Sequence, residues 1–326
     1  MKRPAFLPDN YTLLLVGALV LGSLLPVSGT PAIWLDWLTT AGITLLFFLH
    51  GARLPREAIV AGLTHWRLHL CIFCCTFVVF PVLGLLTRPL LTPLVSTHLY
   101  VGVLFLCMLP STVQSSIALT SMARGNVPAA LCSASASTLL GVLLTPFLVN
   151  WLVVPTGSAG PSMDAVLHIM LQLMLPFIAG HLLRARLGAV IKSRKLVMLV
   201  DRGSILLVVY TAFSAASLAG LWQQVSGSDL AGLLVICALF LAFMLVLSSA
   251  VGRALGFPLA DRITMAFCGS KKSMASGVPI AHILFPAATV GVMVLPLMLF
   301  HPMQLIVCSV LAQRWSKLSP TEHAAA

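Results

Sequence analysis

Two adjacent lysines, Lys271 and Lys272, stand inside an apolar stretch that runs from residue 262 to residue 284. A charge near the centre of a bilayer costs about 2.5–3.5 kcal/mol on insertion scales. Apolar residues lie on both sides of the pair, so the two ammonium groups cannot both reach a membrane interface. We therefore predict that the pair lies in a polar, protein-lined substrate or ion site. Its small polar neighbours belong to the same predicted site: Gly269, Ser270 and Ser273.

The lysine pair also predicts a break in the helix that carries it. Adjacent residues of an unbroken helix diverge by about 100°, which would aim one lysine away from any single site. A break at Gly269 or Lys272 relieves this conflict. In the alternative interpretation the segment is a cytoplasmic loop and the span begins at Met274. The remaining apolar stretch would then be too short to cross a bilayer, so we favour the broken helix.

A second polar cluster follows Pro110 within another apolar stretch. Pro110 removes a backbone donor, and hydroxyl and amide groups crowd the next positions. Polar backbone and side chains at membrane depth are tolerated where they line a cavity or are covered by protein. Hydrogen bonding between packed helices is the alternative. We predict that the cluster contributes to the same site: Ser111, Thr112, Gln114, Ser115 and Ser116.

Ser133 and Ser137 lie four residues apart in the next apolar stretch and share one helix face. They either contact the broken helix that follows Pro110 or serve as small residues that let helices approach closely. Both interpretations stay open, and both serines are included among the predicted site residues.

The positions of the acidic residues indicate the charge of the site. All eight Asp and Glu residues fall in tails, loops or the ends of apolar stretches. A membrane core with two lysines and no carboxylate has a positive field. Such a field favours an anionic substrate or replaces a bound cation.

Composition then places these residues in a membrane protein. Hydrophobic residues make up 59% of the 326, and charged residues only 8%, against about a quarter in globular domains. We predict an all-α membrane protein with ten transmembrane helices of about 20 residues each. The predicted spans are 11–27, 35–53, 68–87, 99–123, 127–153, 163–183, 203–222, 230–252, 262–284 and 287–313.

The basic residues predict the orientation of these spans. Of the 19 Lys and Arg residues, 16 lie in one set of alternate loops and tails, and only Arg88 lies in the opposite set. Positive charge accumulates in cytoplasmic loops, so both termini are predicted to be cytoplasmic in a bacterial inner membrane. The net charge of +11 does not indicate nucleic-acid binding, because the basic residues occur in short clusters between apolar stretches.

Two broken spans, the fourth and the ninth, divide the predicted ten into two sets of five. An odd number of spans per half makes the second half inverted relative to the first, as in many secondary transporters. We therefore predict a single transporter domain, 1–326, with one repeat at about 11–153 and the other at about 163–313.

The sequence resembles the bile acid:sodium symporter family over nearly its whole length. The resemblance rests on four segments, Ser111 to Ser116, Arg124-Gly125-Asn126-Val127, Ser137-Thr138-Leu139-Leu140 and Cys268 to Ser273. The last resembles the ninth helix of the sodium bile acid symporter-like subgroup, which also includes the seventh vertebrate member. This resemblance implies panel and core domains, with the fourth and ninth helices crossing at their breaks. It also implies sodium near Ser115 and Ser116.

The chain departs from the family pattern at the sodium site. Ala266 or Phe267 occupies the position of the family's ninth-helix glutamate, and Lys271 and Lys272 stand where that family has neutral amides. We hypothesise that Lys271 acts as a built-in cation. Transport would then be uncoupled from sodium at that site, or coupled to protons, because burial disfavours the charged form of a lysine.

Two functions of different classes follow from these observations. The favoured one is a secondary transporter that moves a small organic anion by alternating access. The alternative is a membrane-embedded regulator or sensor that binds ions without net transport. An enzyme is not expected, because no His, Asp and Glu constellation lies in the predicted membrane core. No cofactor is expected beyond a coupling ion, sodium or a proton.

Overall fold

The computed structural model describes residues 10–53, 65–153, 163–188 and 193–317. These residues form helices and connecting turns, with no strand among them. The helices before the first break are α1 (Asn10–Leu24), α2 (Thr30–Arg53), α4 (Trp66–Cys74), the π-helix η1 (Cys75–Val79), α5 (Phe80–Leu86), α6 (Arg88–Leu91) and α7 (Thr97–Met108). Next come α8 (Gln114–Met122), α9 (Val127–Val153), α10 (Met163–Leu183), α12 (Arg194–Leu218), α13 (Leu221–Gln224) and α14 (Gly227–Ala254). The last three are α15 (Leu259–Gly269), α16 (Met274–Leu284) and α17 (Ala287–Ser316).

Six helices within the described ranges are long and apolar enough to cross a membrane. Shorter apolar helices accompany them, at Leu13–Leu24, Thr97–Met108 and Leu171–Leu183. Helix also covers most of each apolar stretch named above. The N-terminal tail and most of the 53–67 loop, both of which enter the charge count, lie outside the described residues.

The predicted fourth and ninth spans are each two helices separated by non-helical backbone. α7 ends before Pro110, and α8 begins at Gln114. α15 ends at Gly269, and α16 begins after Ser273, whose hydroxyl accepts a hydrogen bond from the Ser276 amide at 3.2 Å. Pro110 ends the first helix because it cannot donate, and Ser273 caps the second.

The predicted third span has a feature that the hydrophobic pattern does not indicate. Between α4 and α5 the helix widens into η1 at Cys75–Val79, where the amide of Phe80 donates to the carbonyl of Cys75. Such π-helical turns frequently mark functional sites.

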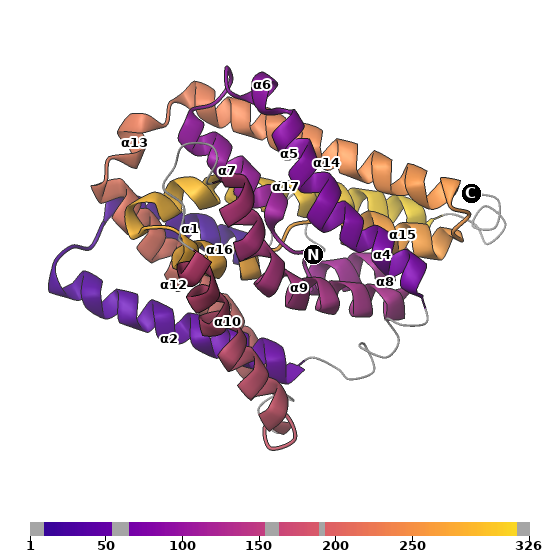
Figure 1. The fold of residues 1–326 in the computed structure, drawn as a ribbon, viewed down its shortest axis with the longest axis horizontal. Coiled ribbons are helices and arrows are strands. Elements are labelled where there is room, and N and C mark those ends of the chain that lie inside the picture. The colour runs from indigo at the N-terminus through magenta and orange to yellow at the C-terminus, as the bar shows by residue number, and fades with distance from the viewer. Residues whose placement is uncertain (1–9, 54–64, 154–162, 189–192, 318–326) are drawn as a thin grey trace, which may run out of the picture.

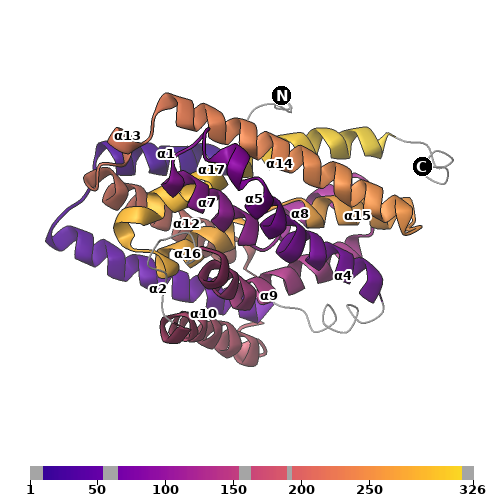
Figure 2. The ribbon, with the colours of Figure 1, turned by 45° about the horizontal axis from the view of Figure 1, so that its top comes forward.

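The helices pack in pairs around a buried apolar interior. α2 lies across α10, and α1 lies along α12, on one side of the molecule (Figures 1 and 2). The other side contains α7, α14 and α17 together with the two pairs of short helices. α12 packs against α16 and α17 and so joins the two sides.

The crossing of α2 and α10 depends on two glycines. A Cβ atom on Gly51 would overlap the carbonyl of Phe177, and a Cβ on Gly180 would overlap the carbonyl of Phe48. Small residues of this kind allow the backbones of membrane helices to approach closely. The backbones of α2 and α10 are thus in direct contact at these two glycines.

We expect Gly51→Val to lower the stability of the protein by about 1–3 kcal/mol, because the added side chain forces the two backbones apart. The measurement is the apparent melting temperature in detergent, followed by tryptophan fluorescence. Gly203→Val is the matched control, since a Cβ on this helical glycine meets nothing within 4 Å. Equal losses in the two variants would contradict the close-contact explanation.

Candidate functional site

The two helix breaks meet in the interior of the protein. The amide of Ser273, in the break between α15 and α16, donates to the carbonyl of Pro110 at 2.8 Å. Glycines allow this close approach. A Cβ on Gly277 would lie 2.5 Å from Leu109, and a Cβ on Gly141 of α9 would lie 2.5 Å from Pro110. The predicted polar residues of the two breaks therefore gather around one crossing.

The end of α7 leaves carbonyl groups that its own helix cannot satisfy. Each carbonyl from Cys107 to Pro110 accepts from another element. The ammonium of Lys272 donates to Cys107 and Leu109, at 2.7 and 2.8 Å. The hydroxyl of Thr145 on α9 donates to Met108 at 2.9 Å. These bonds give a donor to each of the four carbonyls from Cys107 to Pro110.

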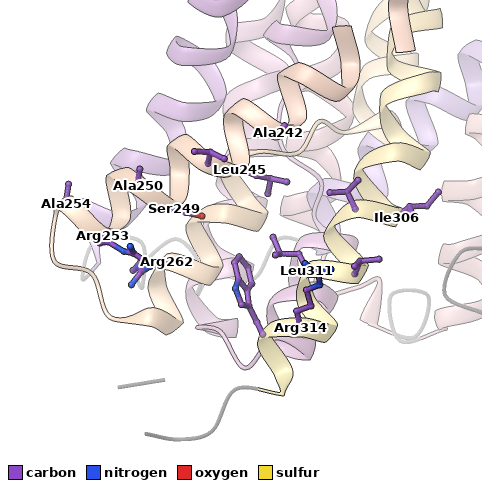
Figure 3. A pocket seen from close by; sticks show the side chains of 14 residues that line it. Ala242, Leu245, Ser249, Ala250, Arg253, Ala254, Arg262, Ile306, Leu311 and Arg314 are labelled. Atoms are coloured by element: carbon purple, nitrogen blue, oxygen red, sulfur yellow. The ribbon is translucent and has the colours of Figure 1, made fainter. Parts of the chain in front are cut away.

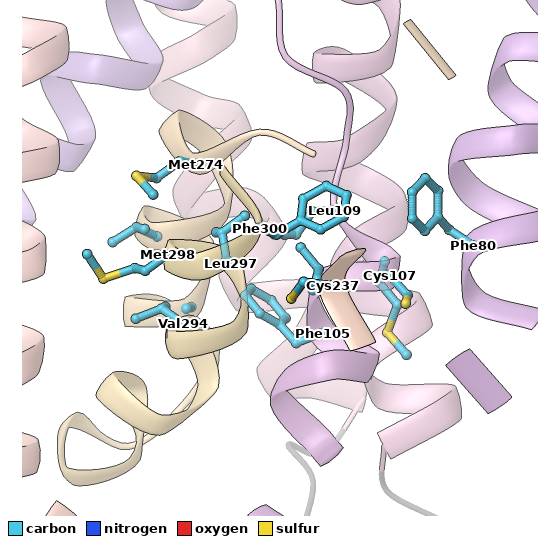
Figure 4. Close-up of a cluster of buried hydrophobic side chains, with 14 of the residues drawn as sticks. Phe80, Phe105, Cys107, Leu109, Cys237, Met274, Val294, Leu297, Met298 and Phe300 are labelled. Atoms are coloured by element: carbon cyan, nitrogen blue, oxygen red, sulfur yellow. The ribbon is translucent and has the colours of Figure 1, made fainter. Parts of the chain in front are cut away.

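Lys272 is the central residue of the crossing. Its side chain is 0% exposed, and its third ammonium bond reaches the carbonyl of Thr76 at 2.8 Å. The ammonium nitrogen also lies 4.1 Å from the centroid of the Phe80 ring, a cation–π contact. Figure 4 shows Phe80 beside the end of α7 that carries Cys107 and Leu109. The three N–H groups of the ammonium thus meet three carbonyl oxygens, which form a carbonyl cage around it.

The Thr76 carbonyl is available because of the π-helix. In an α-helix the Thr76 carbonyl would accept a hydrogen bond from the amide of Phe80, but that amide donates to the carbonyl of Cys75 instead. The next residue, Pro81, has no N–H to offer. The sequence Cys75-Thr76 followed by Phe80-Pro81 therefore frees one buried carbonyl for Lys272.

The side chain of Gln304 on α17 forms hydrogen bonds with the backbone of the second break. Its side-chain oxygen accepts from the Lys272 amide at 2.9 Å, and its side-chain nitrogen donates to the Lys272 carbonyl at 2.9 Å. Its nitrogen also lies 3.0 Å from Nδ1 of His301. One amide side chain thus satisfies both backbone groups that the missing helical turn leaves exposed.

Lys271 has different surroundings. It is also 0% exposed, but its ammonium donates to a hydroxyl, that of Ser115, at 3.3 Å. The ammonium lies 5.8 Å from the centroid of the Phe267 ring. Ser115 is only half-buried, and the adjacent Gln114 is exposed. Lys271 therefore points toward the accessible beginning of α8, whereas Lys272 points into the carbonyl cage.

The hydroxyl groups of the first break form a short network. The hydroxyl of Thr112 lies 2.7 Å from that of Ser115 and 3.1 Å from that of Ser116. Ser116 donates onward to the carbonyl of Phe267 at 3.1 Å. This bond joins α8 to α15.

The remaining predicted residues have separate roles. The Ser137 hydroxyl accepts from the amide of Ser111 at 3.0 Å, so it contacts the broken segment. Ser133 instead bonds to His69 of α4 at 2.6 Å, away from the break. Ser270 bonds back to the carbonyl of Ala266. Gly269 lets α15 lie against η1, because a Cβ there would be 3.2 Å from Cys75.

Sequence reasoning missed two residues of the site, Thr76 and Gln304. Pro81, five positions after Thr76, is the one local signal for a carbonyl without a donor. Gln304 is an amide residue within the apolar sequence of α17. A polar side chain at membrane depth is itself a signal of a functional position. The contacts with Lys272 that place both residues in the site join positions more than 30 residues apart in the sequence.

We expect Gln304→Leu to lower stability by roughly 2 kcal/mol or more, because it leaves the amide and carbonyl of Lys272 buried without partners. The apparent melting temperature in detergent measures this loss. Gln313→Leu, on the exposed face of the same helix, makes the same chemical change without touching the break. A drop in melting temperature as large for Gln313→Leu would count against the bridging role.

Comparison with known proteins identifies the family. Residues 9–317 match the model of the SBF-like CPA transporter family. An uncharacterized protein of Pseudomonas aeruginosa is 59% identical over 97% of this chain and 96% of its own. YfeH of Escherichia coli, named as a candidate symporter, is 52% identical over 95% and 93%. Sodium/bile acid cotransporter 7 of Rattus norvegicus is 27% identical over 91% and 88%. This chain belongs to the SBF-like CPA transporter family.

Proposed function

We propose that the protein is a secondary transporter that moves a small organic anion across the bacterial inner membrane by alternating access. The observation that carries this proposal is the Lys272 ammonium, bonded to three backbone carbonyls at the crossing of two broken helices. Broken helices that meet in the membrane are typical of transporter binding sites. The relatives named as symporters and cotransporters support the same class of function.

In this proposal Lys272 takes the place of a coupling cation. Carbonyl oxygens are the ligands that a sodium ion prefers, and here the ammonium already occupies them. A carboxylate that could bind sodium beside it is absent among the described neighbours, where Ser116 and the Phe267 carbonyl meet instead. The structure thus favours Lys272 over Lys271 as the built-in cation.

Lys271 is then the residue that meets the substrate. Its single hydroxyl partner leaves part of its donor capacity for an incoming anion. Ser115 and Gln114 offer further polar groups at the accessible beginning of α8. A carboxylate or sulfonate group is the chemistry that fits the Lys271 ammonium with its hydroxyl neighbour Ser115.

The architecture in this proposal has ten spans in two inverted repeats, with both termini cytoplasmic. The panel consists of α1, α2, α10 and α12, and the core contains the two broken helices with their neighbours. The tight pairing of α2 with α10 and of α1 with α12 supports this division. Movement of the panel against the core would expose the crossing to each side in turn.

The regulator without net transport is the second function considered. The buried, fully bonded Lys272 is consistent with it, since a static ion-binding core needs no moving substrate. The accessible polar surface beside Lys271 favours transport instead, because it offers an entry point for an anion.

We expect wild-type protein in liposomes to take up an organic anion at the same rate with an inward gradient of sodium or of choline. Cholate is the first probe of a panel of carboxylates and sulfonates. Lys272→Ser frees the three carbonyls, so its uptake without sodium falls about tenfold and sodium restores it in part. Sodium also raises the melting temperature of Lys272→Ser but not of the wild type.

Lys195→Ser, on an exposed lysine of α12, is the matched control. Strong sodium dependence of wild-type uptake would overturn the role of Lys272 as a cation. If sodium stabilises Lys272→Ser but neither this variant nor the wild type moves any of the anions tested, the result would favour the regulator.

We expect a fluorescent protein fused after Lys317 to fold and fluoresce, and alkaline phosphatase fused at the same place to stay inactive, because the C-terminus is cytoplasmic in the proposed topology. Fusions after Thr92, in the loop that follows Arg88, give the reverse pattern. Active phosphatase at the C-terminal fusion would contradict the proposed orientation.

A further inference from the structure

A groove of about 920 Å³ runs between α14 and α17 on the outer surface of the protein (Figure 3). Its walls are apolar side chains from both helices, among them Leu245, Val246, Ile306 and Leu311. Val246, Ile306 and neighbouring residues are exposed, so this surface faces the bilayer rather than another helix. An apolar groove on a membrane-facing surface is suited to a hydrocarbon chain.

One end of the groove carries three guanidinium groups. Arg253 lies at the end of α14, Arg262 in the first turns of α15, and Arg314 at the end of α17 (Figure 3). Among the residues that the structure describes, no acidic one lines the groove. Arg253 and Arg314 form no ion pair with a carboxylate of the described residues. This end of the groove therefore has a positive potential, which attracts an anion.

The backbone fixes the positions of Arg253 and Arg262. α14 ends in a tight turn in which Gly256 has a φ of +71°, the Phe257 amide donates to the carbonyl of Gly252, and the Gly256 amide donates to that of Arg253. Arg262 packs across Gly252, where a Cβ would lie 3.0 Å from its Cγ. The two arginines are therefore held next to each other by the turn that joins their helices.

Trp315 follows Arg314 in the last turn of α17. It lines the groove, and its ring lies 5.2 Å from that of Phe267, centroid to centroid. Tryptophan is enriched at the level of lipid headgroups, where its apolar ring and its N–H both find partners. Its place beside the arginines marks this end as the interfacial one.

We propose that this groove is a binding site for an anionic phospholipid. The phosphate of the headgroup binds Arg253, Arg262 and Arg314, and an acyl chain lies along the apolar walls formed by α14 and α17. Arginine suits this role because its planar fork donates two hydrogen bonds to one phosphate. Basic pockets between membrane helices commonly recognise lipid headgroups in this way. The proposal is independent of which substrate the protein carries.

The test is native mass spectrometry of the delipidated full chain in detergent, titrated with dioleoyl phosphatidylglycerol or dioleoyl phosphatidylcholine. Phosphatidylglycerol is expected to bind in preference to phosphatidylcholine. Arg253→Gln combined with Arg314→Gln is expected to weaken that binding about 30-fold, since each basic residue near a lipid headgroup contributes roughly a factor of five. Arg186→Gln combined with Lys195→Gln removes the same charge from exposed positions elsewhere and is expected to leave binding unchanged.

A second variant tests the acyl chain separately. Ser249→Phe fills the groove and keeps all three arginines, so it is expected to lose phospholipid binding without a change in charge (Figure 3). Equal binding of the two lipids, or unchanged binding in both Ser249→Phe and the double arginine variant, would overturn the proposal. Glycerol 3-phosphate that binds as tightly as the intact lipid would also overturn it, because the site would then be one for a soluble phosphate ester.

Discussion

A buried ammonium with no carboxylate beside it in the described part of the chain is the constraint on which the core of this structure depends. An isolated charge in an apolar interior is prohibitively costly, and it becomes tolerable only when each of its donors meets an acceptor. Lys272 meets three backbone carbonyls, and two of them come from the broken end of α7. The helix break and the lysine therefore need each other. The break supplies oxygens that would otherwise be unsatisfied, and the lysine supplies the protons.

This mutual requirement joins three other stretches of chain to the break that carries Lys272. The π-turn η1 contributes Thr76, the α7 end contributes Cys107 and Leu109, and α17 contributes Gln304, which holds the backbone of Lys272 in place. Close approach at Gly141 and Gly277 brings the neighbouring helices near enough for these contacts. The crossing is thus a polar centre held by backbone atoms, with apolar packing such as the Phe80–Phe300 contact around it (Figure 4).

Much of this arrangement could be predicted from the sequence, and the reasons are local. Composition and run length predict apolar helices, Pro110 predicts the first break, and the Lys271–Lys272 pair predicts the second. The partners of the lysines could not be predicted, because backbone carbonyls are the same at every residue and carry no signal of their own. The π-turn at Cys75–Val79 has an ordinary apolar sequence. Ser133 and Ser137 share one helix face and yet bond to different elements, a difference that only the packing of α4 and α7 decides.

The covalent attachment of the Lys272 ammonium has a thermodynamic consequence. A dissociable ion enters from one compartment and leaves into the other, and the free energy of its gradient is spent in each cycle. A tethered cation returns with the protein to its starting position, so over a complete cycle it moves no net charge and draws on no ion gradient. If Lys272 serves as the cation of this carrier, the site by itself can only bring its anion to electrochemical equilibrium. A membrane potential that is negative inside would then drive the anion outward, and net flow would follow the membrane voltage and the supply of substrate.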